Sequence, residues 1–175
     1  MAILEILKTQ AKEEIISALN EIIKNHPGGE AFFDHMDDYL INQASPLVYK
    51  TIFTIIGNRT LVLSGGFGKR IADGIDSGEF PKRPYHLFKG GMRSGVSPVL
   101  IRSRANFEGE SVFVDDTIYG GATYFKIKDF INALAGKNYL TNCFAVYDGS
   151  PVKREEVESI FRYYDYHQVK SNFVF

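Results

Sequence analysis

Two adjacent carboxylates, Asp115 and Asp116, directly follow a short run of β-branched and aromatic residues. Such a run is typical of a strand that is covered on both faces. After the acidic pair, Gly120 and Gly121 allow a tight turn with inward-pointing N–H groups, and an amphipathic helix is predicted to follow. Because a helix N-terminus attracts phosphate, the segment 111–123 is predicted to hold a sugar phosphate.

This segment resembles the phosphoribosyl pyrophosphate (PRPP) signature of the type I phosphoribosyltransferases, which is a hydrophobic strand, two acidic residues and a small-residue loop ending in Gly-x-Thr. The resemblance implies that Asp115 and Asp116 face the ribose 2- and 3-hydroxyls, take part in catalysis and help to hold Mg²⁺. Tyr119 is a further catalytic candidate, since it stands where many purine-specific members have an acidic residue that assists the base. The loop would wrap the 5-phosphate and bind substrate through Thr117, Ile118, Tyr119, Gly120, Gly121, Ala122 and Thr123.

Other motifs that place acidic residues after a strand, or that form a phosphate-binding loop, fit this sequence less well. A receiver domain needs most of a domain after its acidic pair, whereas 59 residues follow Asp116. A haloacid-type phosphatase needs Asp-x-Asp, and a nucleotide P-loop needs Gly-Lys-Ser or Gly-Lys-Thr, but this chain has Asp-Asp-Thr and Gly-Ala-Thr. A purely structural strand and turn would leave two adjacent carboxylates that something must solvate or bind.

A second glycine loop follows an earlier apolar strand, predicted at 60–63. Glycine permits a left-handed backbone and close approach to an anion. The resemblance implies that this loop contacts pyrophosphate through backbone amides, with a cis peptide between Leu63 and Ser64. An ordinary strand-to-helix turn is the alternative. The implied substrate-binding residues are Leu63, Ser64, Gly65, Gly66 and, through its charge, Lys69.

Between the two loops, two strands flank a basic, glycine-rich loop that contains Lys89 and Arg93. The resemblance implies a lid that closes over PRPP and excludes water, with these two cations as catalytic residues. A surface hairpin is the alternative. The wider interval 69–104 holds eight Lys or Arg against three acids, which suits a polyanionic small substrate, although solvated charge is the common explanation. The net charge of −1 makes nucleic acid an unlikely partner.

Length and composition predict one domain. A chain of 175 residues with 45% hydrophobic content has the size and composition of a single globular domain. No run reaches the roughly 18 to 20 apolar residues of a membrane helix, and the start lacks signal-peptide features, so we expect no membrane partner and a cytoplasmic protein. Cys143 alone excludes an internal disulfide, and the four histidines show no metal-ligand spacing.

Apolar periodicity predicts helices at 3–24 and about 31–41, and a third at 46–56 begins at a Ser45-Pro46 cap. The elements then alternate, which predicts an α/β fold with a mostly parallel central sheet and helices on both faces. Ligands in such sheets bind at the carboxyl ends of strands. We expect a helical hood at 1–44, a core at 46–150 and a C-terminal extension at 151–175. The order predicted after the third helix is strand 60–63, helix 67–75, strands 85–89, 98–102 and 111–114, helix 123–135, strand 141–146 and helix 152–161.

The resemblance implies Mg²⁺-dependent transfer of a phosphoribosyl group between PRPP and a nitrogenous base, with release of pyrophosphate, or the reverse reaction. A homodimer is left open, as is the acceptor base. Asp148 or Ser150 could hydrogen-bond that base, and the aromatic group at Phe161, Tyr163, Tyr164 and Tyr166 could stack on it or simply pack. The competing hypothesis is a noncatalytic module of the same fold that senses PRPP or a nucleotide, and Tyr119 favours it.

Overall fold

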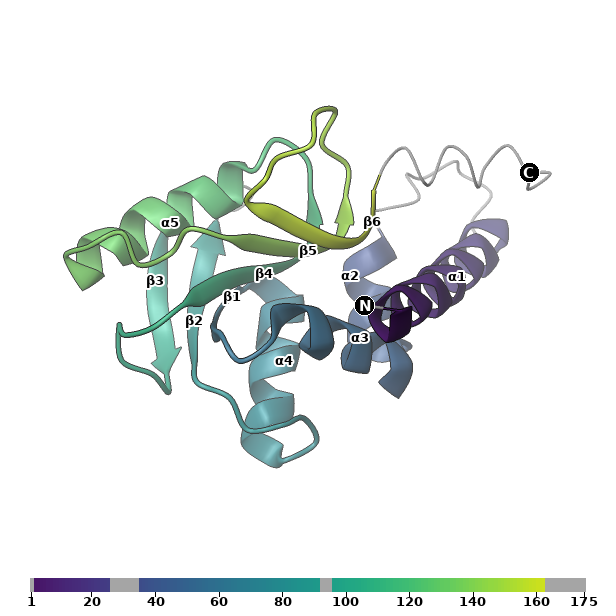
Figure 1. Ribbon diagram of the computed structural model, residues 1–175, viewed down its shortest axis with the longest axis horizontal. Coiled ribbons are helices and arrows are strands. Elements are labelled where there is room, and N and C mark those ends of the chain that lie inside the picture. The colour runs from purple at the N-terminus through teal and green to yellow at the C-terminus, as the bar shows by residue number, and fades with distance from the viewer. Residues whose placement is uncertain (1, 26–34, 92–95, 163–175) are drawn as a thin grey trace.

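The structure of the protein, a computed structural model, describes residues 2–25, 35–91 and 96–162 (Figure 1). Its centre is a six-stranded sheet with the strand order β3-β2-β1-β4-β5-β6. The strands are β1 (Thr60–Ser64), β2 (Tyr85–Gly91), β3 (Val96–Ser103), β4 (Ser111–Ile118), β5 (Cys143–Asp148) and β6 (Val157–Arg162). The helices are α1 (Ala2–Lys24), α2 (Met36–Asn42), α3 (Pro46–Ile56), α4 (Gly65–Ser77) and α5 (Ala122–Ala135).

The sheet is parallel except at one edge. β1 pairs in parallel with both β2 and β4, and β4, β5 and β6 continue the parallel order, whereas β2 and β3 form an antiparallel pair. The predicted α/β class with a mostly parallel sheet is therefore confirmed. The chain winds outward from β1 to β2 on one side and from β4 to β5 on the other, so the strand order reverses between β1 and β4. A ligand crevice forms at such a reversal, at the carboxyl ends of the strands.

Two hydrophobic cores lie on the two faces of the sheet. Leu61 and Leu63 of β1 face the core made with α1 to α4, while Val62 between them faces the core made with α5. This alternation follows from the two-residue period of a strand. Figure 1 shows α5 on the face opposite α4. Both faces of the central strands are covered, which explains their continuous apolar runs.

The N-terminal helices are joined to one another by one carboxylate. Glu14 of α1 accepts hydrogen bonds from Tyr39 of α2 and from the backbone N–H and hydroxyl of Ser45. Ser45 in turn accepts from the N–H of Leu47 and caps α3, which begins at Pro46 as predicted. α2 is thereby tied to α1 and to the start of α3. Among the described helices, none combines the length and the apolar character needed to cross a bilayer.

Three sequence predictions need correction. The helix predicted at 152–161 is wrong, because residues 157–162 form strand β6, which pairs with β5 and buries Val157, Ile160 and Phe161. Hydrogen bonding to the open edge of β5 stabilises this segment as a strand more than local propensity stabilises it as a helix. The second helix is shorter than predicted, Met36–Asn42, and residues 31–34 lie outside the described residues. β4 extends to Ile118, so the acidic pair lies within the strand and not after it.

Candidate functional site

A cavity of about 490 Å³ opens at the carboxyl ends of β1 and β4, where the strand order reverses. Most of the residues predicted to bind substrate line it together. The chain brings them there from the end of β1, the start of α4, the end of β4 and the turn into α5. The lining residues are Asp37, Ser64, Gly65, Gly66, Gly90, Asp115, Asp116, Thr117, Ile118, Tyr119, Gly120, Gly121, Ala122, Thr123 and Tyr124.

The acidic pair reaches the cavity because β4 is longer than its neighbour β1. The pairing with β1 ends at Val114, while pairing with β5 continues through Asp115. Asp115 is half-buried, and its Oδ1 accepts a hydrogen bond from the backbone N–H of Asp116 at 2.9 Å. Burial, and then the neighbouring charge of Asp116, raise the pKa of Asp115 well above its usual range. A cation or a hydroxyl donor would relieve this repulsion.

The turn after the acidic pair requires glycine at one position. Gly121 has a φ of 80°, in the left-handed region, and immediately precedes α5. A Cβ there would lie 2.6 Å from Nη1 of Arg154 and 3.0 Å from the ring of Phe125, so a side chain would strain the backbone and collide with two neighbours. Because a glycine N-cap offers no side-chain acceptor, the first N–H groups of α5 are available to an anion.

The connection between β5 and β6 supports this turn from behind. Arg154 donates from Nη2 to the carbonyl oxygen of Gly120 at 3.1 Å, and its guanidinium lies over the ring of Phe125. The Nη1 atom of Arg154 is buried and has no hydrogen-bond partner in the described part of the chain. Sequence reasoning missed Arg154, since no spacing links it to a loop more than thirty residues earlier. It is a cation held directly behind the proposed phosphate loop.

Two polar residues proposed for the acceptor base are engaged within the protein. Ser150 donates from its hydroxyl to the carbonyl oxygen of Tyr119 at 2.9 Å. Asp148 is 1% exposed and accepts from the N–H of Ser150 and from Nε of Arg162. Both therefore fix the end of β5 against the loop. Phe161 is buried in the core, and Tyr163, Tyr164 and Tyr166 lie outside the described residues.

Tyr119 stands at the exposed side of the same loop. Its side chain is 44% exposed, and its ring meets that of Tyr147 edge to face, with 6.2 Å between centroids. Gly149 lies beneath the ring, since a Cβ there would come within 2.5 Å of it. The ring is thus held in place by a glycine and a second aromatic residue.

The glycine pair at the start of α4, Gly65 and Gly66, lies next to a third carboxylate. Asp37 of α2 accepts a hydrogen bond from the backbone N–H of Phe67, in the first turn of α4, at 3.0 Å. A Cβ on Gly66 would lie 3.0 Å from the other oxygen of Asp37, so the glycine permits this approach. Asp37 was missed by sequence reasoning, because an acidic residue in a short helix carries no distinguishing signal. Its carboxylate lies where the resemblance implies pyrophosphate.

The backbone of this loop differs from the expectation. The described residues contain no cis peptide, so the bond between Leu63 and Ser64 is trans and the expected cis form is wrong. The chain turns instead through Gly65, whose φ is 70°. A trans bond with a left-handed glycine is the less costly way to make such a turn.

Three predicted residues that the structure describes do not line the cavity. Leu63 is fully buried in the core beneath the loop. Lys69, on the exposed side of α4, forms an ion pair with Asp73. Lys89 is exposed on β2, next to Gly90, which does line the cavity. Arg93 lies outside the described residues.

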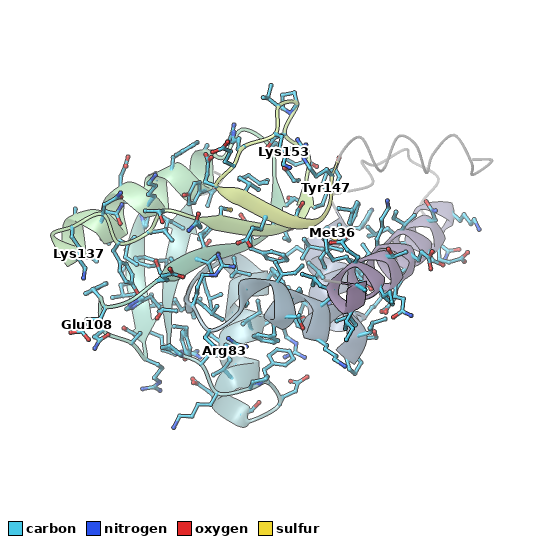
Figure 2. The ribbon with its side chains drawn as sticks, in the orientation of Figure 1. Met36, Arg83, Glu108, Lys137, Tyr147 and Lys153 are labelled. Atoms are coloured by element: carbon cyan, nitrogen blue, oxygen red, sulfur yellow. The ribbon has the colours of Figure 1, made fainter. Side chains whose placement is uncertain are left out.

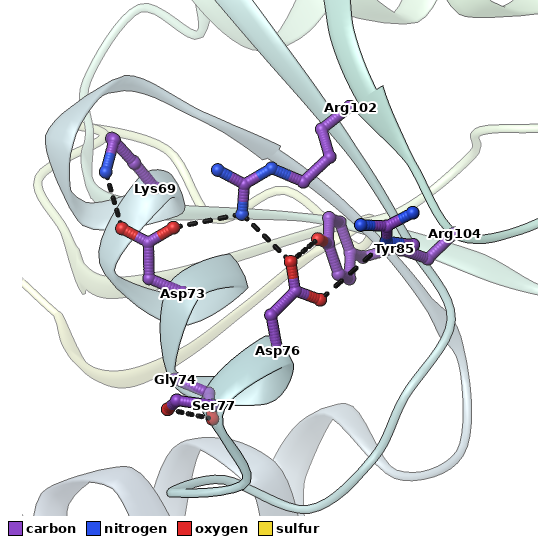
Figure 3. Close-up of polar contacts among 8 residues, drawn as sticks. All are labelled: Lys69, Asp73, Gly74, Asp76, Ser77, Tyr85, Arg102 and Arg104. Carbon is purple, nitrogen blue, oxygen red and sulfur yellow. Dashed lines mark hydrogen bonds and ion pairs between the residues drawn. The ribbon is translucent and has the colours of Figure 1, made fainter.

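The basic interval 69–104 is partly neutralised by its own acids, as Figure 3 shows for α4 and β3. Asp73 binds both Lys69 and Arg102, and Asp76 binds Arg102 and Arg104. Outside that view, Arg70 forms a two-pronged pair with Glu79. Hydrogen bonding to Lys69, and then to Arg102, lowers the pKa of Asp73. Half of the eight cations in this interval are therefore engaged away from the cavity.

The oxygen ligands in the cavity are of the type that Mg²⁺ prefers, namely carboxylates. In residues 2–25, 35–91 and 96–162, however, no group of three or more acidic, histidine or cysteine side chains is arranged to hold a metal ion. Mg²⁺ usually keeps several waters and binds through one or two carboxylates together with substrate phosphates. The pair Asp115 and Asp116 fits that mode and not a preformed protein cage.

No family model matches the chain, and no curated protein matches its sequence. Similar solved structures include a purine phosphoribosyltransferase from Pyrococcus horikoshii Ot3, with 16% identity over 71% of this chain and 81% of that chain and a TM-score of 0.45. A hypoxanthine phosphoribosyltransferase from Staphylococcus aureus has 9% identity over 74% of each chain and a TM-score of 0.41. Orotate phosphoribosyltransferase from Mycobacterium tuberculosis H37Rv has 13% identity over 70% and 72% and a TM-score of 0.45. These are likenesses of fold, so the ligand has to be inferred from the cavity's own residues.

Proposed function

We propose that the cavity binds a phosphoribosyl ligand and that the protein catalyses Mg²⁺-dependent transfer of the phosphoribosyl group between PRPP and a nitrogenous base. One observation carries the proposal: the acidic pair at the end of β4 and the glycine turn before α5 line the same cavity, opposite the N-terminus of α4. Carboxylates for sugar hydroxyls thus lie between two helix N-termini suited to phosphate groups.

The turn at 117–123 is proposed to hold the 5-phosphate. The first N–H groups of α5 would donate to its oxygens, and the hydroxyl of Thr123 would add one donor. Arg154 contributes positive charge behind the turn and holds the carbonyl of Gly120 away from the anion. The turn is therefore anchored before a ligand arrives, which reduces the entropy lost on binding.

Asp115 and Asp116 are proposed to accept hydrogen bonds from the ribose hydroxyls. Burial, and then their mutual repulsion, raise the pKa of Asp115, and hydroxyl donors or a cation would relieve that repulsion. Mg²⁺, when bound, would supply positive charge to the pyrophosphate oxygens, and these two carboxylates are the residues that would hold it. The protein's own task is to fix the ribose so that its anomeric carbon faces the incoming base.

The N-terminus of α4 is proposed to receive the pyrophosphate. The N–H groups near Gly65, Gly66 and Phe67 would bind it, and Lys89 and Arg93 would neutralise its charge as the bond to the anomeric carbon breaks. The departing pyrophosphate takes the bonding electron pair while a base nitrogen forms the new bond. Tyr119, on the exposed side of the turn, is proposed to face that base.

A second candidate function, a noncatalytic sensor of ribose phosphates, is favoured by one observation. Asp37 already accepts from the N–H of Phe67 at the N-terminus of α4. A nucleoside monophosphate leaves that contact intact, whereas PRPP must displace the carboxylate or share the site with it. The sensor would bind nucleotides without turnover.

Pyrophosphate release separates the two candidates. The protein is offered PRPP and Mg²⁺ with orotate, uracil, adenine, guanine, hypoxanthine or xanthine. Release with one base, reduced in Lys89→Ala while PRPP still binds, supports the transferase, because Lys89 then acts mainly in the transition state. Lys82→Ala, an exposed cation outside the cavity, is the matched control. Tight PRPP binding without release for every base favours the sensor.

A further inference from the structure

A second cavity, of about 590 Å³, lies between α3 and the connection from α4 to β2. It shares no lining residue with the cavity at the acidic pair. Its volume is within the range of roughly 300 to 1,000 Å³ in which small-molecule sites are found. Nothing in the proposed phosphoribosyl chemistry uses it.

Aromatic rings form much of its wall. The rings of Tyr49 and Phe80 have centroids 4.5 Å apart, and those of Phe53 and Phe80 are 5.3 Å apart. Tyr49 is fixed by its hydroxyl, which donates to the carbonyl oxygen of Leu40. Burial raises the pKa of Tyr49 to about 12, so its ring stays neutral. Three rigid rings of this kind favour a ligand with a flat apolar body.

Two guanidinium groups lie against these rings, and within the described part of the chain only that of Arg70 has a carboxylate partner. Arg70 lies 4.9 Å from the centroid of Phe80 and forms two hydrogen bonds with Glu79, at 2.9 and 2.6 Å. Arg83, labelled in Figure 2, lies 5.4 Å from the centroid of Phe53. Its Nε atom is buried and has no hydrogen-bond partner among the described residues.

An unpaired buried donor is costly, and burial also lowers the pKa of Arg83. A carboxylate beside the guanidinium of Arg83 would compensate its positive charge. The charge of the wall points the same way, since the described lining residues include three cations, Lys50, Arg70 and Arg83, and one carboxylate, Glu79. The cavity therefore suits an anion.

We propose that this cavity binds a small aromatic carboxylate, with its ring against Phe53 and Phe80 and its carboxylate against the guanidinium of Arg83. An arginine donates its N–H groups to a carboxylate with matching geometry, and the neighbouring aromatic faces exclude water from the contact. A neutral molecule of the same shape would leave the positive charge of Arg83 uncompensated. Tight binding therefore requires both the negative charge and the aromatic ring of the ligand.

The test uses 2-naphthoate as the probe, titrated by calorimetry into the full chain up to about 5 mM, since a dissociation constant near 1 mM is still measurable binding. Naphthalene-2-carboxamide is the uncharged control of equal shape. We expect the carboxylate to bind about tenfold more tightly than the amide, and Arg83→Gln to lose about that factor. Arg83→Lys keeps the positive charge but loses the planar guanidinium with its paired N–H donors, so it should recover only part of the affinity.

Site identity is checked with variants elsewhere. Asp116→Asn should leave naphthoate affinity unchanged, because Asp116 lines the other cavity. Arg83→Gln should in turn leave ribose 5-phosphate binding unchanged. The proposal is overturned if naphthoate does not bind, if the amide binds equally well, or if a folded Arg83→Gln, judged by unchanged near-ultraviolet circular dichroism, keeps full affinity.

Discussion

The carboxylate of Asp37 on α2 accepts a hydrogen bond from the backbone N–H of Phe67 in the first turn of α4, with 3.0 Å between Oδ1 and the nitrogen. An acidic side chain from the N-terminal helices thereby occupies the end of α4 that would otherwise attract an anion. Any diphosphate bound there meets this negative charge. The contact also joins α2 to the central domain, so the helices and the ligand compete for one N–H group.

The first prediction concerns this competition. Asp37→Asn keeps an acceptor for Phe67 but removes the charge, so pyrophosphate and PRPP should bind more tightly, by several-fold to about tenfold. Asp38→Asn is the matched control, because Asp38 is exposed on the same helix and contacts Asn42 instead. Calorimetric titration with pyrophosphate measures the difference. Equal affinities in wild type and Asp37→Asn would show that pyrophosphate does not approach α4.

The second prediction concerns the turn before α5. Gly121→Val should weaken ribose 5-phosphate binding by about tenfold or more, because a side chain strains the left-handed backbone and pushes Arg154 and Phe125 away from the turn. Gly136→Ala is the control, since Gly136 has a φ of 67° at the other end of α5 but open space around it. Gly136→Ala should lose stability and keep affinity. Undiminished affinity in a folded Gly121→Val would contradict the site.

The third prediction concerns the pH dependence of stability. The pKa of Asp115 is raised above its ordinary value of 3.8, so the folded state holds its proton at pH values where the unfolded state has lost it. Well below pH 3.8, Asp115 is protonated in both the folded and the unfolded state, so it does not change the free energy of unfolding. Above pH 3.8, stability is lost as pH rises, by up to about 1.4 kcal/mol per pH unit, until the folded pKa is passed.

Asp115→Asn removes this loss, so its unfolding free energy should exceed that of wild type by an amount that grows with pH and then levels off. Urea unfolding across pH 3.5 to about 8 measures it, within the range where such linkage is usually seen. Asp129→Asn, at an exposed carboxylate on α5, should show no such growing gain. A gain that shrinks as pH rises would contradict the assigned direction.

The fourth prediction concerns Arg154. Arg154→Ala removes the donor to Gly120 and the charge behind the turn, so ribose 5-phosphate affinity should fall by about tenfold or more, about the worth of one charge-assisted hydrogen bond. Pyrophosphate affinity should change little, because α4 is not touched. Lys153→Ala, at the exposed neighbouring cation, is the control. An equal loss in both variants would indicate a general effect of positive charge.

The parts of the site that could be predicted are those encoded by adjacent residues. The strand, acidic pair and glycine turn at 111–123 form one continuous pattern, and the alternation of elements indicates which strand ends meet. Asp37 and Arg154 could not be found in this way, because helix packing and the β5–β6 connection bring them to the cavity from distant positions.

The failed helix prediction and the partly neutralised basic interval have the same physical origin. Residues 152–161 have a local pattern compatible with a helix, but the free edge of β5 recruits Val157–Arg162 as a strand. The charges of the interval 69–104 sum to an excess in sequence, yet folding places Arg102 on Asp73 and Asp76. Strand pairing and ion pairs between residues distant in sequence therefore decided both outcomes. A short stretch of sequence does not reveal such contacts.

The central claim is that Asp115, Asp116 and the turn before α5 form one ribose phosphate site, and calorimetric titration with PRPP and Mg²⁺ tests it most directly. Wild type should bind PRPP, and the double variant Asp115→Asn/Asp116→Asn, which keeps shape but loses both charges, should bind at least about tenfold more weakly and lose the Mg²⁺ dependence. Absence of PRPP binding in wild type, or equal and equally Mg²⁺-dependent affinity in a folded double variant, would contradict the account.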